Sequence, residues 1–126
     1  MNILIIGSGG REYAIGLRLT QDNQKHNLFF SPGNGATANL GQNVDIKDFN
    51  ELAKFALENK IELTIVGPEN ALSDGVVDIF KANNLTIFGP SRAAARLESS
   101  KAYMKEFLAK NSIRTARFIN TNNYDE

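Results

Sequence analysis

Short, unbroken apolar runs that end in glycine or proline turns limit this chain to few folds. Continuous apolar residues are expected of strands covered on both faces, as in a parallel sheet. Four such runs are predicted as strands, at residues 2–6, 27–30, 62–66 and 85–88. Between these strands, helices are predicted at residues 11–20, from Asp48 onward and around Val76–Phe80, with apolar residues at helical spacing in the last two. This alternation predicts an α/β fold, a Rossmann-like parallel sheet with helices on both faces.

Three loops rich in turn residues each follow one of these strands, at residues 7–12, 31–37 and 67–70. Parallel strands place all their carboxyl ends at one edge of the sheet, and open α/β sheets bind ligands at that edge. We therefore expect the three loops to converge on one ligand site.

The chain changes character after Pro90. Residues 91–97 and 100–110 are predicted as two helices in quick succession, and residues 115–119 as the start of another strand. That strand has no visible partner before Glu126, so the sequence reads as if it were cut inside a second unit.

Composition excludes several classes of function. The 126 residues amount to one domain, and 14 basic side chains balance 14 acidic ones, so the charge that nucleic-acid binding needs is missing. The chain has no cysteine and one histidine, His26, which excludes disulfides, thiolate metal sites and a histidine zinc cluster. The apolar run at the N-terminus is too short for a signal peptide or a membrane span. We therefore expect a cytoplasmic protein without nucleic-acid or membrane partners and without a metal site in these residues.

The first loop carries Gly7, Gly9 and Gly10 between a strand and a helix, where backbone N–H groups and the helix dipole favour a phosphate. A dinucleotide fingerprint needs a third glycine at position 12, which is Glu12, and an acidic ribose clamp that residues 29–35 lack. A Walker A ending is absent too. A structural turn, a phosphate or sugar site and, less favoured, an NAD site remain open.

The other two loops are ambiguous when taken singly. Pro32-Gly33-Asn34-Gly35 is typical of a plain turn, whereas Glu69, held by Gly67-Pro68, is placed to accept hydrogen bonds from vicinal hydroxyls or is simply solvated. Arg11 and Lys101 stand near predicted helix N-termini, where the dipole disfavours a cation. Either cation therefore indicates an anionic ligand, unless it is an ordinary surface residue.

Four motifs taken in register are far more specific than any one of them. GSGGREYA at 7–14, SPGNG at 31–35, VGPENALSDGVVD at 66–78 and GPSRAAARLESSKAYMKEFLAKNSI at 89–113 span nearly the whole chain. Together they resemble the N-terminal part of the phosphoribosylamine–glycine ligase (glycinamide ribonucleotide synthetase) family of the ATP-grasp superfamily. One departure is visible, since the family usually has histidine where Tyr13 stands.

The resemblance implies a pre-ATP-grasp domain at residues 1–100 and the start of a truncated ATP-grasp domain at 101–126. It implies an ATP-dependent ligase of purine biosynthesis that joins glycine to 5-phosphoribosylamine, giving glycinamide ribonucleotide, ADP and phosphate. ATP and Mg²⁺ or Mn²⁺ would serve the full-length enzyme. This fragment alone is expected to bind no cofactor, to hold no catalytic residue and to be inactive. The alternative is a non-catalytic Rossmann-like module that binds a nucleotide or a sugar phosphate.

The resemblance also implies residue roles. Glu69 is expected to bind the ribose hydroxyls of the substrate, with Arg11 and the loop amides near the sugar or its phosphate. Lys101 matches the lysine that reaches ATP phosphates. The full set of expected substrate-binding residues is Gly7, Gly9, Gly10, Arg11, Gly33, Asn34, Gly35, Gly67, Pro68 and Glu69.

Overall fold

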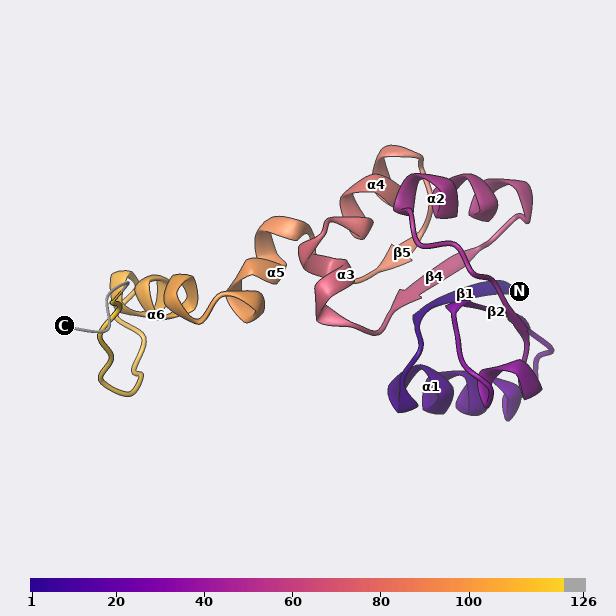
Figure 1. Cartoon of the computed structure of the whole chain (residues 1–126), viewed down its shortest axis with the longest axis horizontal. Helices are drawn as coiled ribbons and strands as arrows, with labels where there is room; N and C mark the ends of the chain where they lie inside the picture. The colour runs from indigo at the N-terminus through magenta and orange to yellow at the C-terminus, as the bar shows by residue number, and fades with distance from the viewer. Residues whose placement is uncertain (122–126) are drawn as a thin grey trace.

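A five-stranded parallel sheet forms the centre of the structure, a computed structural model that describes residues 1–121 (Figure 1). The strands are arranged in the order β3-β2-β1-β4-β5. In chain order the elements are β1 (Asn2–Gly7), α1 (Gly10–Thr20), β2 (Asn27–Pro32), the 3-10 helix η1 (Thr37–Asn39), β3 (Gln42–Asn43), α2 (Phe49–Glu58), β4 (Leu63–Val66), α3 (Glu69–Ser73), α4 (Val76–Ala82), β5 (Ile87–Phe88), α5 (Arg92–Ser99) and α6 (Lys101–Lys110). The predicted α/β fold is confirmed.

Helices cover both faces of the sheet, as the unbroken apolar strands indicate. On β1, Ile3 and Ile5 pack towards α1 together with Phe30, whereas Leu4 and Ile6 pack towards α2 and α4 on the other face. Phe30 is completely buried against α1. Alternate side chains of one strand thus enter two separate cores, which explains why no polar residue interrupts the run.

Local signals account for where the helices begin. Asp48 caps α2, because its carboxylate accepts hydrogen bonds from the backbone N–H groups of Asn50 and Glu51, both at 2.9 Å. The sequence did not indicate η1, the two-residue strand β3 or the short helix α3. Residue 69, expected in a loop, is the first residue of α3.

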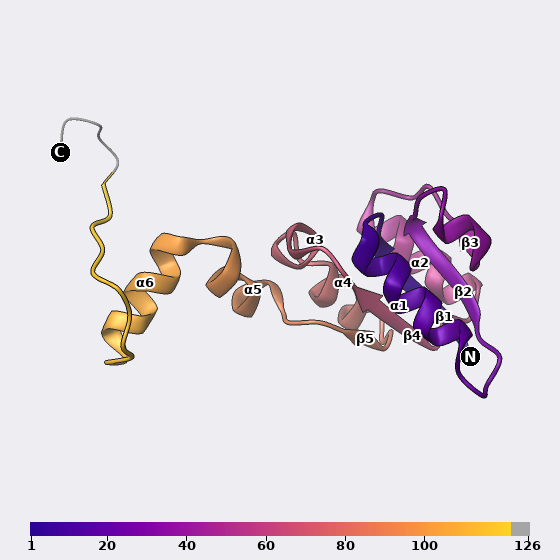
Figure 2. The same cartoon turned by 90° about the horizontal axis from the view of Figure 1, so that it is seen from below.

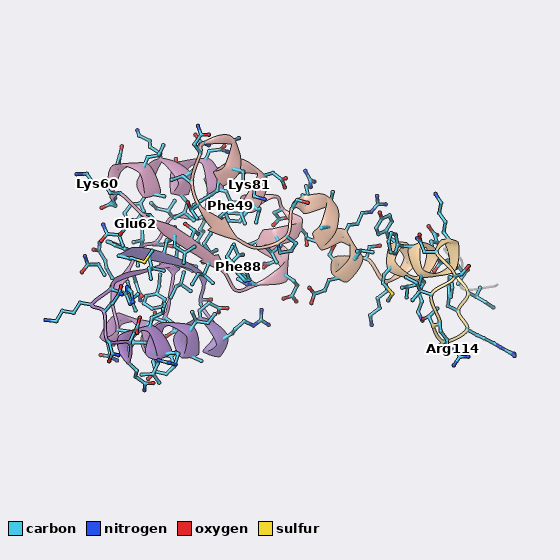
Figure 3. All side chains as sticks on the ribbon, turned by 180° about the vertical axis from the view of Figure 1, so that it is seen from behind. Phe49, Lys60, Glu62, Lys81, Phe88 and Arg114 are labelled. Carbon is cyan, nitrogen blue, oxygen red and sulfur yellow. The ribbon has the colours of Figure 1, made fainter. Side chains whose placement is uncertain are left out.

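The region after β5 extends away from the sheet, so that α6 lies far from β1 and β2 in two perpendicular views (Figures 1 and 2). Helix α6 buries none of its residues. In Figure 3, Arg114 lies beyond the far end of α6, whereas Phe88 lies on the edge strand β5 of the sheet. The side chain of Phe88 is itself 73% exposed.

The prediction of a strand at residues 115–119 is wrong, since this segment has neither helix nor strand structure. A strand needs a neighbour for its backbone groups, and none lies beside this segment in the described part of the chain. Lys105 on α6 instead donates hydrogen bonds to Oγ1 of Thr115 at 2.7 Å and to the carbonyl of Ala116 at 3.3 Å.

Candidate functional site

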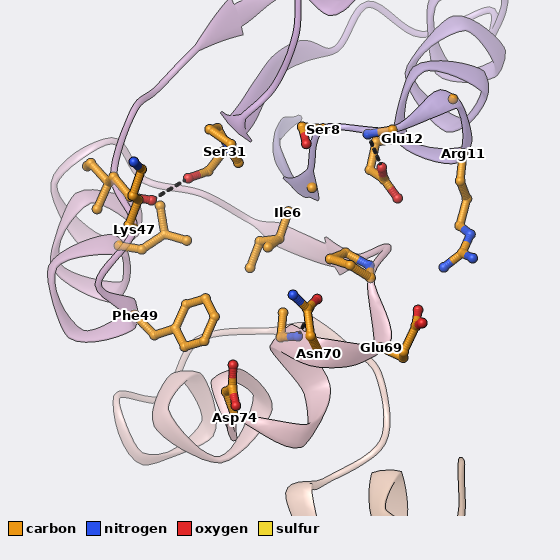
Figure 4. Close-up of a pocket in the computed structure, with 18 residues that line it drawn as sticks. Ile6, Ser8, Arg11, Glu12, Ser31, Lys47, Phe49, Glu69, Asn70 and Asp74 are labelled. Carbon is orange, nitrogen blue, oxygen red and sulfur yellow. Dashed lines mark hydrogen bonds between the residues drawn. The ribbon is translucent and has the colours of Figure 1, made fainter. Parts of the chain in front are cut away.

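A cavity of about 530 Å³ opens at the carboxyl edge of the sheet (Figure 4). Its wall contains residues 6–12 from the end of β1 to the start of α1, and Ser31 and Pro32 at the end of β2. It is completed by Ile46, Lys47, Phe49 and Leu52 around the start of α2, and by residues 68–71 and Asp74 on and beside α3. The loops after β1 and β4 and the end of β2 thus meet at one edge of the sheet as expected, whereas residues 33–37 do not line the cavity and the binding of a ligand there stays a prediction.

Strand order explains why the cavity forms there. The chain runs from β1 outwards to β2 and β3, then returns to place β4 on the other side of β1. The loops after β1 and β4 consequently diverge to opposite faces of the sheet and leave a crevice between them, as at the switch point of doubly wound folds.

The glycine loop brings the N-terminus of α1 to this crevice. Gly7 has a φ of 130°, a backbone conformation that residues other than glycine rarely adopt. Gly9 is the N-cap residue of α1. Arg11 extends along the mouth of the cavity, where its Nη1 donates a hydrogen bond to the carbonyl of Gly67. The guanidinium therefore ties α1 to the turn after β4.

Glu12 is the buried carboxylate of the site. The sequence analysis noted it only because it stands where a dinucleotide fingerprint would have a third glycine. It is 4% exposed, and its Oε2 accepts a hydrogen bond from the N–H of Gly9 at 2.6 Å. A Cβ on Gly67 would lie 1.8 Å from its Oε1, and a Cβ on Gly7 would lie 2.6 Å from its Cδ. Two of the predicted substrate-binding glycines are thus needed to make room for Glu12. A glutamate three residues after an N-cap position is half of a capping-box pattern, a sequence signal that could have indicated this contact.

The second loop lies beside the cavity rather than in its wall. Asn34 donates from Nδ2 to the carbonyl of Ser8 at 2.8 Å, and its Oδ1 accepts from the backbone N–H groups of Ala36 and Thr37 at 2.8 and 3.0 Å. Its side chain therefore joins the loop after β2 to the loop after β1. Gly33, with a φ of 72°, and Gly35 complete this turn, and direct ligand contacts from the three residues stay a prediction.

The third loop presents Glu69 at the mouth of the cavity. This exposed carboxylate points towards Arg11 in Figure 4 and forms no hydrogen bond or ion pair with any residue that the structure describes. Pro68 and Asn70 line the cavity on either side of it. Glu69 is consequently available to a ligand.

The far wall holds residues that the sequence analysis did not single out. Lys47 precedes the N-cap of α2, Phe49 begins that helix, and Asp74 follows α3. The side chain of Ser31 donates to the carbonyl of Ile46 at 2.8 Å, which fixes this wall to β2 (Figure 4). No sequence pattern links these positions, because the crossing from β3 to α2 brings Lys47 and Phe49 to the cavity and the crossing from β4 to α3 brings Asp74.

Lys101 lies apart from this cavity. It is the first residue of α6, exposed, on the segment that extends away from the sheet. Ser100 caps the helix by accepting the N–H of Tyr103 at 3.3 Å. The predicted helix N-terminus is confirmed, whereas a phosphate contact of Lys101 stays a prediction.

Metal-ligating side chains and membrane-spanning helices can be assessed for the described residues. Within residues 1–121, no three His, Cys, Asp or Glu side chains are grouped so that they could hold a metal ion. None of the helices in residues 1–121 has the length and apolar character needed to cross a membrane. Outside the cavity, the hydrogen bond from His26 lowers the pKa of Asp22 below its ordinary value of 3.8.

Comparison with known families adds independent information. The family "Phosphoribosylglycinamide synthetase, N domain" matches residues 1–98. Phosphoribosylamine–glycine ligase of Clostridium acetobutylicum is 44% identical over 128 residues, covering 100% of this chain and 31% of its own length. The ligase of Pasteurella multocida is 51% identical over 124 residues, covering 95% of this chain and 29% of its own. The chain therefore spans about a third of the length of these curated relatives.

Solved structures show the same fold. The crystal structure of phosphoribosylamine–glycine ligase from Thermotoga maritima matches with a TM-score of 0.64 and 33% identity, covering 93% of this chain and 26% of that one. N5-carboxyaminoimidazole ribonucleotide synthetase from the same organism matches with a TM-score of 0.72 over 98% of this chain and 34% of that one. At 17% identity the second match shows the fold alone.

Proposed function

This chain belongs to the phosphoribosylglycinamide synthetase N-domain family, and we propose that it is the N-terminal part of an ATP-dependent ligase that joins glycine to 5-phosphoribosylamine. In that reaction the glycine carboxylate takes the γ-phosphoryl group of ATP, releasing ADP. The substrate amine then attacks the acyl carbon, loses a proton and displaces phosphate, which yields glycinamide ribonucleotide. Support comes from a family match over residues 1–98 and from relatives about three times longer than this chain.

Within such an enzyme, the described domain would hold the phosphoribosyl substrate. The observation that carries this proposal is the cavity at the carboxyl edge, where Glu69 offers a carboxylate with no protein partner in the described residues. Such a group accepts hydrogen bonds from the two vicinal ribose hydroxyls, and bonds to a charged acceptor are stronger than neutral ones. Arg11, with guanidinium N–H groups beyond the one given to Gly67, would contact the sugar or its phosphate.

ATP and its metal ion would be bound mainly by residues outside this chain, since this chain spans only 31% of the length of the Clostridium acetobutylicum ligase. Lys101 is proposed to reach the ATP phosphates as the first residue of a second domain that begins near residue 101. The family match that ends at residue 98 and the lack of buried residues on α6 support this boundary. The chain alone should then lack ligase activity, and a cytoplasmic location is expected of the enzyme.

Titration of this chain with glycinamide ribonucleotide, followed by amide NMR shifts, tests the proposal. Saturable shifts are expected at residues 7–11 and 67–70, with none on addition of NAD. Glu69→Gln should weaken binding about tenfold, because a hydrogen bond to a charged group contributes about 1.5–3 kcal/mol. Glu98→Gln, the same change on an exposed residue of α5, should leave the affinity unchanged. Shifts with NAD alone, or no shifts with glycinamide ribonucleotide, would refute the assignment.

A further inference from the structure

Glu12 places a buried negative charge in the cavity wall, at the position where a glycine loop most often receives a phosphate. Figure 4 shows its carboxylate at the start of α1, between Ser8 and Arg11, where it forms part of the cavity wall. Oε2 is bonded to the N–H of Gly9, whereas Oε1 has no hydrogen-bond partner among residues 1–121. Glu12 is 4% exposed and lines the cavity, so Oε1 keeps its capacity to accept a hydrogen bond from a donor that enters the cavity.

The same carboxylate changes what the loop can bind. A helix N-terminus attracts an anion through its free N–H groups and the positive end of its dipole. Here Glu12 already takes the N–H of Gly9 and places a full negative charge beside that end of α1. The loop therefore has an internal anion in the place of an external one.

The surrounding charges do not cancel this effect. Besides Glu12, the wall holds the cations Arg11 and Lys47 and the carboxylates Glu69 and Asp74. Arg11 is directed to the carbonyl of Gly67 rather than to Glu12. Three carboxylates thus face two cations, and loss of the Glu12 charge would leave the wall balanced.

We propose that Glu12 determines which chemical group the glycine loop accepts. Its free Oε1 accepts a hydrogen bond from a hydroxyl or amino group of the sugar, and its charge keeps the phosphate of the same ligand away from Gly9 and Gly10. This inference rests on the proposed function for the identity of the sugar, but the exclusion of phosphate does not. It also accounts for the glycines at positions 7 and 67, since a Cβ at either position would meet the Glu12 side chain and displace its carboxylate.

A purely structural cap would stabilise α1 without affecting ligand preference, so selectivity is the decisive readout. Glu12→Gln keeps the size of the side chain and an oxygen for the N–H of Gly9 but removes the charge. Glu69→Gln is the matched control, the same change in the same cavity on an exposed carboxylate. The probes are inorganic phosphate and ribose 5-phosphate, and the readout is the dissociation constant from the amide shifts of Gly9 and Gly10.

In the unaltered chain, ribose 5-phosphate should bind while phosphate produces no saturable shift at Gly9. Glu12→Gln should admit phosphate to the loop, lowering the ratio of the phosphate to the ribose 5-phosphate dissociation constant at least tenfold. Glu69→Gln should weaken the binding of ribose 5-phosphate without allowing inorganic phosphate to bind at Gly9. If Glu12→Gln does not fold, Glu12→Asp carries the test: it keeps the charge, so phosphate should stay excluded while the sugar binds more weakly.

The outcomes separate this inference from the proposed function. An unchanged ratio in folded Glu12→Gln, or phosphate at Gly9 in the unaltered chain or in Glu12→Asp, overturns the inference whatever the sugars do. If neither ribose 5-phosphate nor glycinamide ribonucleotide binds, the proposed function fails. Even when neither sugar phosphate binds, phosphate binding that appears only in Glu12→Gln supports the inference that the Glu12 charge excludes phosphate. If Glu12→Gln gains no phosphate binding, the inference is overturned.

Discussion

Gly67→Ala should destabilise the fold far more than a single methyl group suggests. The three atoms nearest to the added Cβ all belong to Glu12, at 1.8 Å for Oε1, 2.5 Å for Cδ and 2.8 Å for Cγ. Real Cβ atoms do not approach other atoms so closely, so the buried carboxylate must move. Its displacement breaks the 2.6 Å hydrogen bond from Gly9 at the start of α1.

The expected cost follows from these two effects. Loss of a hydrogen bond to a charged acceptor costs about 1.5–3 kcal/mol. Forcing extra volume into a packed region costs about 1–3 kcal/mol. Glu12 lines a cavity and can recover some hydration there, so the two effects should not add fully. We expect the free energy of unfolding to fall by about 2–4 kcal/mol, combining these ranges.

Urea unfolding followed by far-UV circular dichroism measures this cost. Glu12→Ala should remove the clash, so Gly67→Ala should cost less than about 1 kcal/mol in that background, as a coupled pair does in a double-mutant cycle. Gly35→Ala is the matched control, because its Cβ would meet no atom within 4 Å. A cost for Gly67→Ala below about 0.5 kcal/mol, or an equal cost with and without Glu12, would refute this account of the glycine loop.

Three further substitutions test other parts of the structure by the same unfolding assay. Phe30→Ala removes a completely buried ring and should cost about 3–5 kcal/mol; a cost below that of a surface substitution would contradict the core assignment. Asp48→Ala removes the cap of α2 and should cost about 1 kcal/mol, against almost nothing for exposed Lys54→Ala. The hydrogen bond from His26 lowers the pKa of Asp22 in the folded chain, so its stabilising effect is present above 3.8 and is lost as the pH falls through the lowered value. The free energy of unfolding should therefore fall less in Asp22→Asn than in the unaltered chain over that acid range. If the two proteins lose stability in parallel as the pH falls, the interaction is contradicted.

The fold could be predicted from local patterns because each pattern reports the surroundings of its own residues. The run from Ile3 to Ile6 is apolar throughout because its side chains enter two cores. The cap at Asp48 is local as well, since its hydrogen-bond partners are two and three residues away. The strand expected at residues 115–119 failed for the opposite reason, because a strand depends on a neighbour that no local pattern guarantees.

The candidate site was predictable only in part. The loops at residues 7–12 and 67–70 were expected at one edge because strand direction alone places them there, and they do line the cavity. Lys47 and Asp74 were not, since their positions depend on how the chain crosses from β3 to α2 and from β4 to α3. From the sequence, Asn34 was expected to contact the ligand. In the structure its side chain forms hydrogen bonds with Ser8, Ala36 and Thr37, all of which lie within the loops themselves.

The amino-acid sequence by itself determined the class of fold, the edge at which the loops meet and, through four motifs in register, the family. Each of these depends on residue types and spacings along the chain, which survive without coordinates. Only the tertiary structure decided the role of Glu12, because its meaning comes from Gly67, 55 residues later in the sequence. Read locally, Glu12 breaks the glycine fingerprint and accepts a hydrogen bond at the start of its own helix. In the folded chain it occupies the space that two glycines leave open, since burial and contact are properties of the assembled sheet edge and not of any one segment.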